Sequence, residues 1–382
     1  MWDVSWILEV LKVRYFSLRC YYFIQYSYGE KGLLINPENS WILDLSKKWN
    51  SHPISAVKPM AEIGNYIINK LLSLPQTLPK YPKDHSTLHP VESPPTFRCI
   101  PETSDIISDL VCSKSPNFYD FINRYGNPDV EYPIFLDSML KSCEGKPWKE
   151  NRRLYGAIDI DATADGLASC GLEIPFRNPQ EHVQSDEGWV SSWTPPGAIS
   201  HTHMDFYGST QYFVHISGDK LWLMWPPTER NLEIFSTLHK QPWNADRTME
   251  CIDKLEGLQL LYNDSPLTPF ALKPNTLHAC VSFSSSIHSG MRVCSLPSFN
   301  LSYSLIAWGI RWIKGKNGLT RSELTEEADA IQYEINMWSV LVKKNRHHIH
   351  LSTIKDKLKE LTVSLVDIRK KLDVAPPIVI GK

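Results

Sequence analysis

The sequence predicts an α+β fold in which a sheet-rich middle lies between two helical regions. Between about residues 155 and 296, short apolar segments alternate with turn residues, a pattern typical of antiparallel strands. The flanking segments carry apolar residues at helical spacing instead. We therefore expect an N-terminal helical region with a proline-rich linker over residues 1–103, a strand region over 104–300, and a C-terminal helical region over 301–382.

The N-terminal region contains one clear helix candidate, residues 54–74, followed by a polar, proline-rich segment over 75–101 that reads as a linker or surface loop. Residues 1–28 are apolar and aromatic, but charged residues interrupt them. They lack the uncharged run of about 20 residues that a membrane span needs. They also lack the basic start and clean apolar core of a signal peptide. The expectation is an amphipathic helix or strand that packs on the strand region.

The strand candidates are short and evenly spaced. They cover residues 155–160, 188–193, 199–206, 211–216, 220–224, 258–262, 270–273, 278–283 and 290–296. Many short strands at this spacing predict two packed antiparallel sheets.

The C-terminal region begins with an apolar segment, residues 301–313, and a second helix opens near Ser322. A final apolar stripe recurs in steps of four and three residues: Ile354, Leu358, Leu361, Leu365, Ile368 and Leu372. This stripe is short for a free coiled coil. A helical bundle within one chain, and hence a monomer, is favoured over a dimerisation helix.

The residues with the clearest chemistry are His203, Asp205 and His278. Residues two apart on a strand point to the same face, so His203 and Asp205 can reach one metal ion, and His278 completes the set. Two imidazoles and a carboxylate on one face of an octahedral metal leave positions open, as in non-haem Fe(II) oxygenases. Lys220, near the end of the next strand, offers a positive charge for an acidic co-substrate.

These residues lie in an ordered series of motifs. His203-Met-Asp205 is followed by Gly208-Ser-Thr, then by Gly218-Asp-Lys220 and an apolar strand that ends at Pro226-Pro227, and last by Pro274-Asn-Thr-Leu-His278-Ala. The series resembles the JmjC family of Fe(II)- and 2-oxoglutarate-dependent oxygenases over residues 185–300. The resemblance implies that the two sheets form a double-stranded β-helix, the jelly roll of the JmjC and cupin folds.

The resemblance also implies a role for each site residue. His203, Asp205 and His278 would bind Fe(II), while Lys220 and Ser200 would contact the distal carboxylate of 2-oxoglutarate. The lysine demethylases of the family often carry tyrosine where this chain has Phe213, and the adjacent Tyr212 is the candidate for that phenolic hydrogen bond.

The implied activity is a dioxygenase reaction with O₂ on a protein or peptide substrate, such as a histone tail. Hydroxylation of a side chain and demethylation of N-methyl-lysine both remain open. A cupin-type Zn or Mn protein could use the same three ligands, but it would have no need of Lys220 and Ser200. A catalytically silent JmjC scaffold is the other alternative, and the intact ligand set argues against it.

Two further histidines compete for roles at this site. His201 could face the same site, where a supporting histidine is favoured over a fourth ligand because the metal needs open positions. His288 competes with His278 as the distal ligand. We favour His278 because it follows the turn at Pro274-Asn275 that re-enters a strand.

Composition excludes several other classes. The formal net charge is −2, and no basic stripe suited to nucleic acid appears apart from a short run at residues 343–348. The 8 cysteines form no Cys-x-x-Cys pair, which argues against a zinc finger and favours a reducing nuclear or cytoplasmic compartment over secretion.

Overall fold

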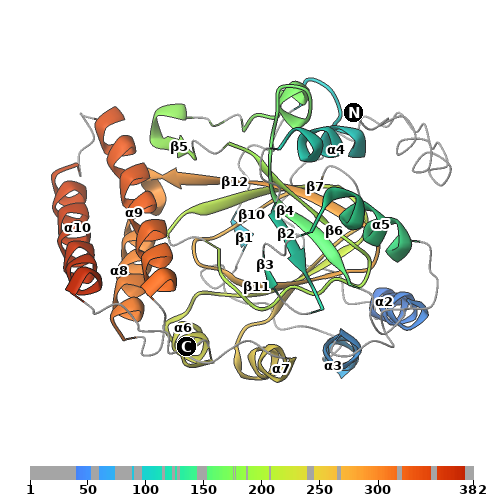
Figure 1. The fold of residues 1–382 in the computed structure, drawn as a ribbon. Helices are drawn as coiled ribbons and strands as arrows, with labels where there is room; N and C mark the ends of the chain where they lie inside the picture. The colour runs from blue at the N-terminus through green and yellow to red at the C-terminus, as the bar shows by residue number, and fades with distance from the viewer. Residues whose placement is uncertain are drawn as a thin grey trace, which may run out of the picture. The chain divides into compact units, whose positions relative to one another are not determined.

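The structure is a computed structural model, and it describes part of the chain. The described residues are 40–52, 60–73, 88–89, 97–113, 117–122, 125–126, 130–143, 153–174, 176, 178–185, 188–205, 208–238, 245–264, 268–315, 321–345 and 351–374. All of them belong to one compact unit, Asn36–Lys382. The expectations for residues 1–28 and for most of the proline-rich segment fall outside the described residues. The helices and antiparallel strands in Figure 1 confirm the predicted α+β class.

The described strands form two antiparallel sheets. The first has the order β1-β10-β7-β12-β6-β4-β2-β3, with β5 also paired to β12, and the second has the order β11-β8-β9. The strands of the first sheet are β1 Leu88–His89, β2 Asn117–Asp120, β3 Tyr125–Gly126, β4 Tyr155–Asp161, β5 His182–Gln184, β6 Val190–Thr194, β7 Thr210–Ser217, β10 Thr268–Leu272 and β12 Ser286–Ser295. Those of the second are β8 Lys220–Trp225, β9 Gln259–Asn263 and β11 Leu277–Ser282.

From β6 onward the chain winds between the two sheets. It passes through β6 in the first sheet, residues 199–203 beside β11 in the second, β7 in the first, β8 and β9 in the second, β10 in the first, β11 in the second and β12 in the first. Eight segments in this order make a double-stranded β-helix. The jelly roll implied by the sequence motifs is therefore confirmed by the strand order.

The segment expected to be a strand over residues 199–206 is less regular than predicted. It makes two isolated bridges, Ile199 with Val281 and His203 with His278, and is not a continuous ladder. The turn at Gly197, where φ is 82°, sets the direction of the chain into this segment. Single bridges are enough to dock the segment on β11.

Side chains from both sheets fill the interior of the jelly roll. Phe213 of β7 packs on Phe270 of β10 with ring centroids 5.0 Å apart, and on Trp222 of β8 at 5.3 Å. Because alternate residues of a strand point to opposite faces, these contacts fix which residues of β7 and β8 face inward. Phe213 and His215 face the interior, as do Lys220 and Trp222.

Four helices, two from the N-terminal region and two from between β8 and β9, pack near the second sheet. These are α2 Ser40–Ser51, α3 Met60–Ser73, α6 Glu229–Leu238 and α7 Ala245–Lys254, which lie in a row in Figure 1. Lys48 of α2 donates to Asp219 at 2.6 Å and to the Tyr262 hydroxyl at 2.9 Å, next to the start of β8. The predicted helix over residues 54–74 is confirmed for α3, whereas residues 53–59 lie outside the described chain.

Two more helices, α4 Thr103–Cys112 and α5 Tyr132–Cys143, lie beside β2 and β4. Asp109 is buried at the inner face of α4 and accepts hydrogen bonds from Thr163 and from the Leu167 amide. This carboxylate therefore ties α4 to the loop that follows β4.

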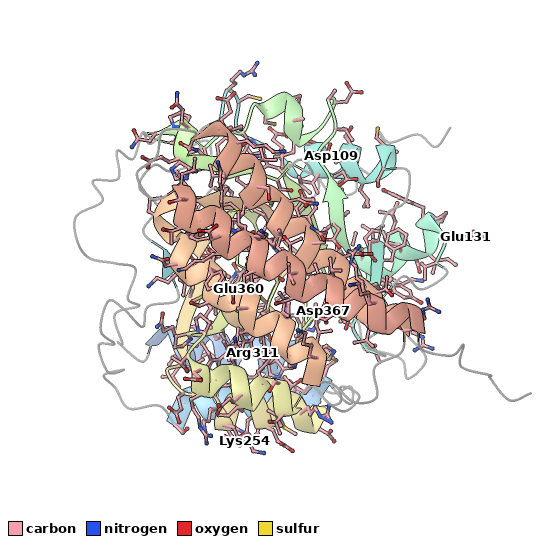
Figure 2. All side chains as sticks on the ribbon, turned by 90° about the vertical axis from the view of Figure 1, so that its left-hand side faces the viewer. Asp109, Glu131, Lys254, Arg311, Glu360 and Asp367 are labelled. Carbon is pink, nitrogen blue, oxygen red and sulfur yellow. The ribbon has the colours of Figure 1, made fainter. Side chains whose placement is uncertain are left out.

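The C-terminal region forms a helical layer of α8 Phe299–Gly315, α9 Arg321–Lys344 and α10 Leu351–Val374 (Figure 1). The stripe residues from Ile354 to Ile368 are buried together with residues of α8 and α9, and Leu365 is 0% exposed. Figure 2 faces this layer, with Glu360 and Asp367 labelled on α10. The predicted stripe therefore packs within a single chain, although Leu372 lies outside the described side chains.

Within the described part of the chain, no helix combines the length and the apolar character needed to cross a bilayer. The cysteines described there are free thiols: Cys99, Cys112, Cys143, Cys170, Cys251, Cys280 and Cys294.

Candidate metal centre

The backbone brings His203 and His278 face to face. The His203 amide donates to the His278 carbonyl at 2.9 Å, and the His278 amide donates to the His203 carbonyl at 2.8 Å. Two residues that exchange both hydrogen bonds in an antiparallel pair carry their side chains on the same face. Their imidazole centroids are 4.3 Å apart, so residues 75 positions apart in the chain present two ring nitrogens to one point.

Each imidazole is held by a backbone carbonyl on its far side. His203 Nδ1 lies 2.7 Å from the His201 oxygen, and His278 Nδ1 lies 3.1 Å from the Thr276 oxygen. A carbonyl oxygen only accepts, so Nδ1 carries the hydrogen in both rings. In the neutral form, Nε2 of each ring is therefore free to donate a lone pair to a metal, the arrangement found around metal-binding histidines.

Asp205 is the third residue of the group that could hold a metal ion. Its two carboxylate oxygens lie 3.4 Å from His203 Nε2 and 3.5 Å from His278 Nε2. The three ligand atoms all lie within 4.8 Å of one another, which is a separation that one metal ion can bridge. The side chains of His203 and Asp205 are 40% and 26% exposed, whereas His278 is 3% exposed. The group is therefore reached from one side.

The electrostatics of the three groups are strongly coupled. Burial lowers the pKa of His278 to about 4, so this imidazole is neutral near pH 7. Burial opposes the charged form of His203, but the hydrogen bond and the charge of Asp205 outweigh it and raise the pKa of His203. Burial would raise the pKa of Asp205, but the charges of both histidines and hydrogen bonds from His203 and Gln211 lower that pKa well below its usual range.

Asn275 contacts Gly208, three residues after Asp205. Its Oδ1 accepts the Gly208 amide at 2.7 Å, and its own backbone has φ of 56° in the left-handed region. Asparagine tolerates this conformation better than most residues. The turn before His278 thus contacts the chain close to Asp205. The sequence offered the Pro274-Asn275 turn as a signal but not this side-chain contact.

Lys220 lies inside the jelly roll and is 3% exposed. Its Nζ is 3.1 Å from His288 Nδ1 and 5.3 Å from the centroid of the Trp222 ring. Burial lowers its pKa, and among the described residues no carboxylate forms an ion pair with it. A buried ammonium without a counter-charge is costly unless an anionic ligand arrives.

Hydrogen-bond donors near Lys220 also lack partners within the described chain. Asn263 is the register partner of Lys220, and Trp222 lies two residues further along the same face of β8. Asn263 Nδ2 and Trp222 Nε1 are both buried without an acceptor there. Unsatisfied buried donors beside an ammonium fit an anionic group with several acceptor atoms.

Ser200 borders the same region. Its hydroxyl oxygen accepts the Cys280 amide at 2.7 Å, and both the charge of Lys220 and the Ser200 hydroxyl act on the Cys280 thiol. Burial nevertheless raises the pKa of that thiol to about 12, so it stays protonated. Ser200 and Lys220 thus both lie next to Cys280.

Tyr212 is not brought to this region. Phe213 faces the interior, so its neighbour on the strand faces the opposite side of the sheet. There the Tyr212 ring packs edge-on against Phe176, with centroids 5.9 Å apart. Gln211, on the inward face, touches Asp205 instead, a contact that sequence reasoning missed.

The two competing histidines take other positions. His201 contributes its carbonyl oxygen to His203, and the group of possible metal ligands does not include its imidazole. His288 lies on β12 in the first sheet and contacts Lys220. The structure groups His278, and not His288, with His203 and Asp205.

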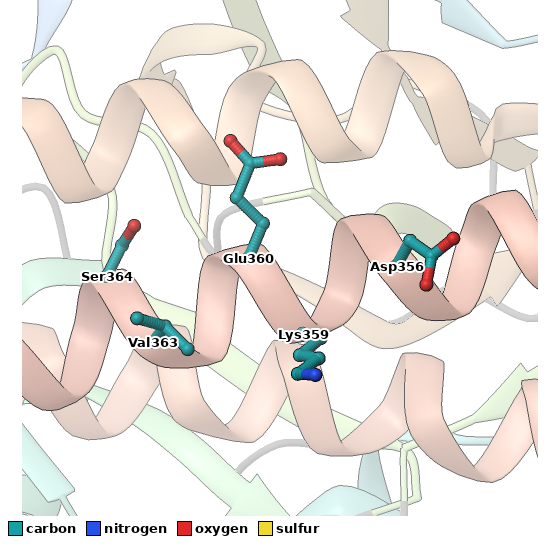
Figure 3. A pocket seen from close by; sticks show the side chains of 5 residues that line it. All are labelled: Asp356, Lys359, Glu360, Val363 and Ser364. Carbon is teal, nitrogen blue, oxygen red and sulfur yellow. The ribbon is translucent and has the colours of Figure 1, made fainter.

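An open hollow lies elsewhere, on α10. It is lined by Asp356, Lys359, Glu360, Val363 and Ser364 (Figure 3). These residues come from one helix and include no histidine or cysteine. The hollow therefore offers no chemistry comparable with that of the jelly roll.

Comparison with known proteins adds one sequence match. No protein-family model matches the chain. The chain is 44% identical over 57 residues to the JmjC domain-containing histone demethylation protein 1 of Debaryomyces hansenii. The predicted resemblance to JmjC proteins is confirmed. The match spans 14% of this chain and 11% of that relative, so it extends over a small part of both proteins.

Among solved structures, the chain is similar to YcfD, a ribosomal oxygenase from Escherichia coli. That comparison covers 75% of this chain and 71% of the other, with 14% identity and a TM-score of 0.29. The assignment of the jelly roll depends on the strand order described above.

Proposed function

We propose that this protein is an Fe(II)- and 2-oxoglutarate-dependent dioxygenase that oxidises a protein substrate, either at a side-chain carbon or at the methyl group of an N-methyl-lysine. One observation carries the proposal. Two imidazoles with fixed tautomers and one carboxylate converge within 4.8 Å, and a buried lysine without a counter-charge lies in the same jelly roll.

His203, Asp205 and His278 would hold the metal. Two imidazole nitrogens and one carboxylate oxygen are the donor set of non-haem Fe(II) oxygenases. The hydrogen bonds on both Nδ1 atoms orient the rings before any metal binds, and Gln211 supports Asp205. Exposure of His203 and Asp205 on one side leaves room for exchangeable ligands.

Lys220 and Ser200 would bind the distal carboxylate of the co-substrate. In the β8–β11 ladder, His278 pairs with Met224, and Lys220 lies four residues earlier on β8. At about 3.3 Å per residue, this is a separation of roughly 13 Å. The lysine side chain spans part of that distance. The remainder suits a short dicarboxylic acid that reaches from the metal to the ammonium.

When bound, Fe(II) with 2-oxoglutarate and O₂ supplies an oxidation in which 2-oxoglutarate becomes succinate and CO₂, and one oxygen atom enters a substrate C–H bond. The chain's own residues orient the reactants. Neutral His278 and ionised Asp205 offer lone pairs, the Lys220 ammonium fixes one end of the co-substrate, and the aromatic interior around Phe213 excludes water.

The wider biology follows from the same proposal. A match to a protein named for histone demethylation supports a protein or peptide substrate such as a histone tail, and a nuclear or cytoplasmic location. In this proposal, residues 104–300 form the catalytic domain. Residues 1–103 and 301–382 flank this domain, with α2 and α3 on one side and α8, α9 and α10 on the other, and the buried C-terminal stripe supports a monomer.

The test is succinate release. Purified protein is incubated with Fe(II), ascorbate, O₂, 2-oxoglutarate and a library of methylated and unmethylated peptides. The proposal expects succinate from the wild type and none from Asp205→Ala. Formaldehyde would accompany succinate for demethylation, whereas a peptide that gains one oxygen atom would indicate stable hydroxylation. Equal succinate from wild type and Asp205→Ala would contradict the proposal.

A further inference from the structure

His288 has no role in the ligand set, yet it lies at a chemically important position. It is an inward-facing residue of β12, and its register partner across the β12–β7 ladder is His215. Its ring packs on two interior aromatics, Trp222 at 5.3 Å and Phe213 at 5.9 Å between centroids. Its Nδ1 is the hydrogen-bond partner of Lys220 at 3.1 Å.

The direction of that hydrogen bond follows from the chemistry of its two atoms. An ammonium group has three donors and no acceptor, so Lys220 donates and His288 Nδ1 accepts through its lone pair. The imidazole is therefore neutral. Consistent with this, burial and the charge of Lys220 hold the pKa of His288 well below its usual range. Since Nδ1 is the acceptor, the ring hydrogen lies on Nε2.

A neutral acceptor suits a lysine that must receive an anion. A carboxylate at this position would neutralise the ammonium and compete with the incoming ligand. No partner at all would leave a buried, mobile ammonium with three unsatisfied donors. The imidazole satisfies one donor and keeps the full positive charge, so two N–H groups remain for the ligand.

The ammonium is also fixed in direction. It contacts His288 Nδ1 and also lies over the Trp222 ring, where a cation is attracted by the aromatic quadrupole. A lysine side chain held at two points loses little further conformational freedom when a ligand binds, and this preorganisation strengthens binding.

We propose that His288 is a positioning residue for the co-substrate, which holds the Lys220 ammonium by a neutral hydrogen bond and directs its remaining two N–H groups at the distal carboxylate of a 2-oxo dicarboxylic acid. This inference rests on the proposed function. It adds a residue that acts through Lys220, lies outside the metal ligands, and discriminates between 2-oxo acids with and without a second carboxylate.

The experiment compares two ligands and three variants. Binding of 2-oxoglutarate and of 2-oxobutyrate, which lacks the distal carboxylate, is measured by calorimetry on protein loaded with Mn(II). His288→Leu removes the acceptor, His288→Gln keeps one, and His288→Glu replaces it with a charge that pairs with Lys220. Thermal unfolding is followed for each variant. His288→Glu keeps Lys220 partnered and tests the proposal even if His288→Leu does not fold.

His288→Leu is expected to weaken the binding of 2-oxoglutarate by about tenfold, because a hydrogen bond to a charged group is lost. His288→Gln should stay within about threefold of the wild type, a difference well below 1 kcal/mol. His288→Glu should bind 2-oxoglutarate more weakly than His288→Leu does. Binding of 2-oxobutyrate should change little in all three variants.

Two results would overturn the inference while leaving the proposed function intact. One is unchanged 2-oxoglutarate binding in His288→Leu or His288→Glu. The other is an equal loss for both ligands, which would indicate a general structural role. A wild-type protein that binds neither 2-oxo acid would instead contradict the proposed function, and this inference with it.

Discussion

Replacing Lys220 by methionine should stabilise the fold and abolish co-substrate binding together. Lys220 is 3% exposed, and among the described residues it has no ion-pair partner. Its lowered pKa means that the folded protein disfavours the charged form. The charged lysine therefore lowers the stability of the folded protein. A lysine with a depressed folded-state pKa destabilises the protein at every pH where the unfolded chain is protonated, and this cost disappears only at high pH.

The magnitude follows from two opposing effects. Exchanging buried charges for an apolar residue of similar size is neutral or stabilising by about 1–4 kcal/mol. The exchange leaves His288 Nδ1 without its donor, which costs about 1–2 kcal/mol. The net change should therefore lie between about 1 kcal/mol of lost and 3 kcal/mol of added stability, which for a chain of 382 residues is a change in Tm of up to about 4 °C.

The assay is thermal unfolding with Mn(II), with and without 2-oxoglutarate. The wild type should gain Tm when the co-substrate is added, because a ligand that binds only the folded state stabilises it. The Tm of Lys220→Met without co-substrate should lie no more than about 1 °C below that of the wild type, and it should not rise when 2-oxoglutarate is added. A variant that is destabilised by more than about 1 kcal/mol, yet still responds to 2-oxoglutarate, would refute the reasoning about this charge.

Two further predictions concern other parts of the molecule. Because the pKa of His203 is raised while that of His278 is about 4, one proton competes with the metal, so apparent Mn(II) affinity should fall about tenfold per pH unit below the His203 pKa. A titration in which affinity is flat from pH 8 to about pH 5 would contradict this. Leu361→Asp places a charge in the stripe, where Leu361 is 2% exposed, and should cost about 3–5 kcal/mol in urea unfolding without changing the mass by light scattering. A wild-type dimer that this change dissociates would show that the stripe also serves as an interface.

Much of the jelly roll could be predicted because its strands are short apolar runs separated by turns. The grouping of the three candidate ligands could be predicted because His203 and Asp205 lie two apart and the ordered motifs added His278, and the structure brings these side chains together. The helices α6 and α7 were missed. Within α7 the described buried positions mix polar and apolar residues, Arg247, Thr248, Cys251 and Ile252, so the buried face carries few of the apolar residues that signal a helix in the sequence.

The side of the sheet on which the Tyr212 side chain lies could not be predicted from the sequence either. Strand β7 is buried on both faces from Thr210 to Ile216, so its composition does not alternate and either aromatic could have faced inward. Only pairing with β10 and β12 selects Phe213. The role of His288 was hidden because the serine run before it reads as a turn, whereas β12 in fact begins at Ser286.

The most direct test of the metal centre is an anaerobic titration of Fe(II) and 2-oxoglutarate, followed by the visible charge-transfer absorption that a chelated 2-oxo acid gives with Fe(II). The wild type should develop this absorption. His278→Ala should not, because one of the three ligand atoms within 4.8 Å is lost. His288→Leu should develop it at a higher co-substrate concentration. Absorption of wild-type intensity and affinity in His278→Ala would contradict the assignment of the metal ligands.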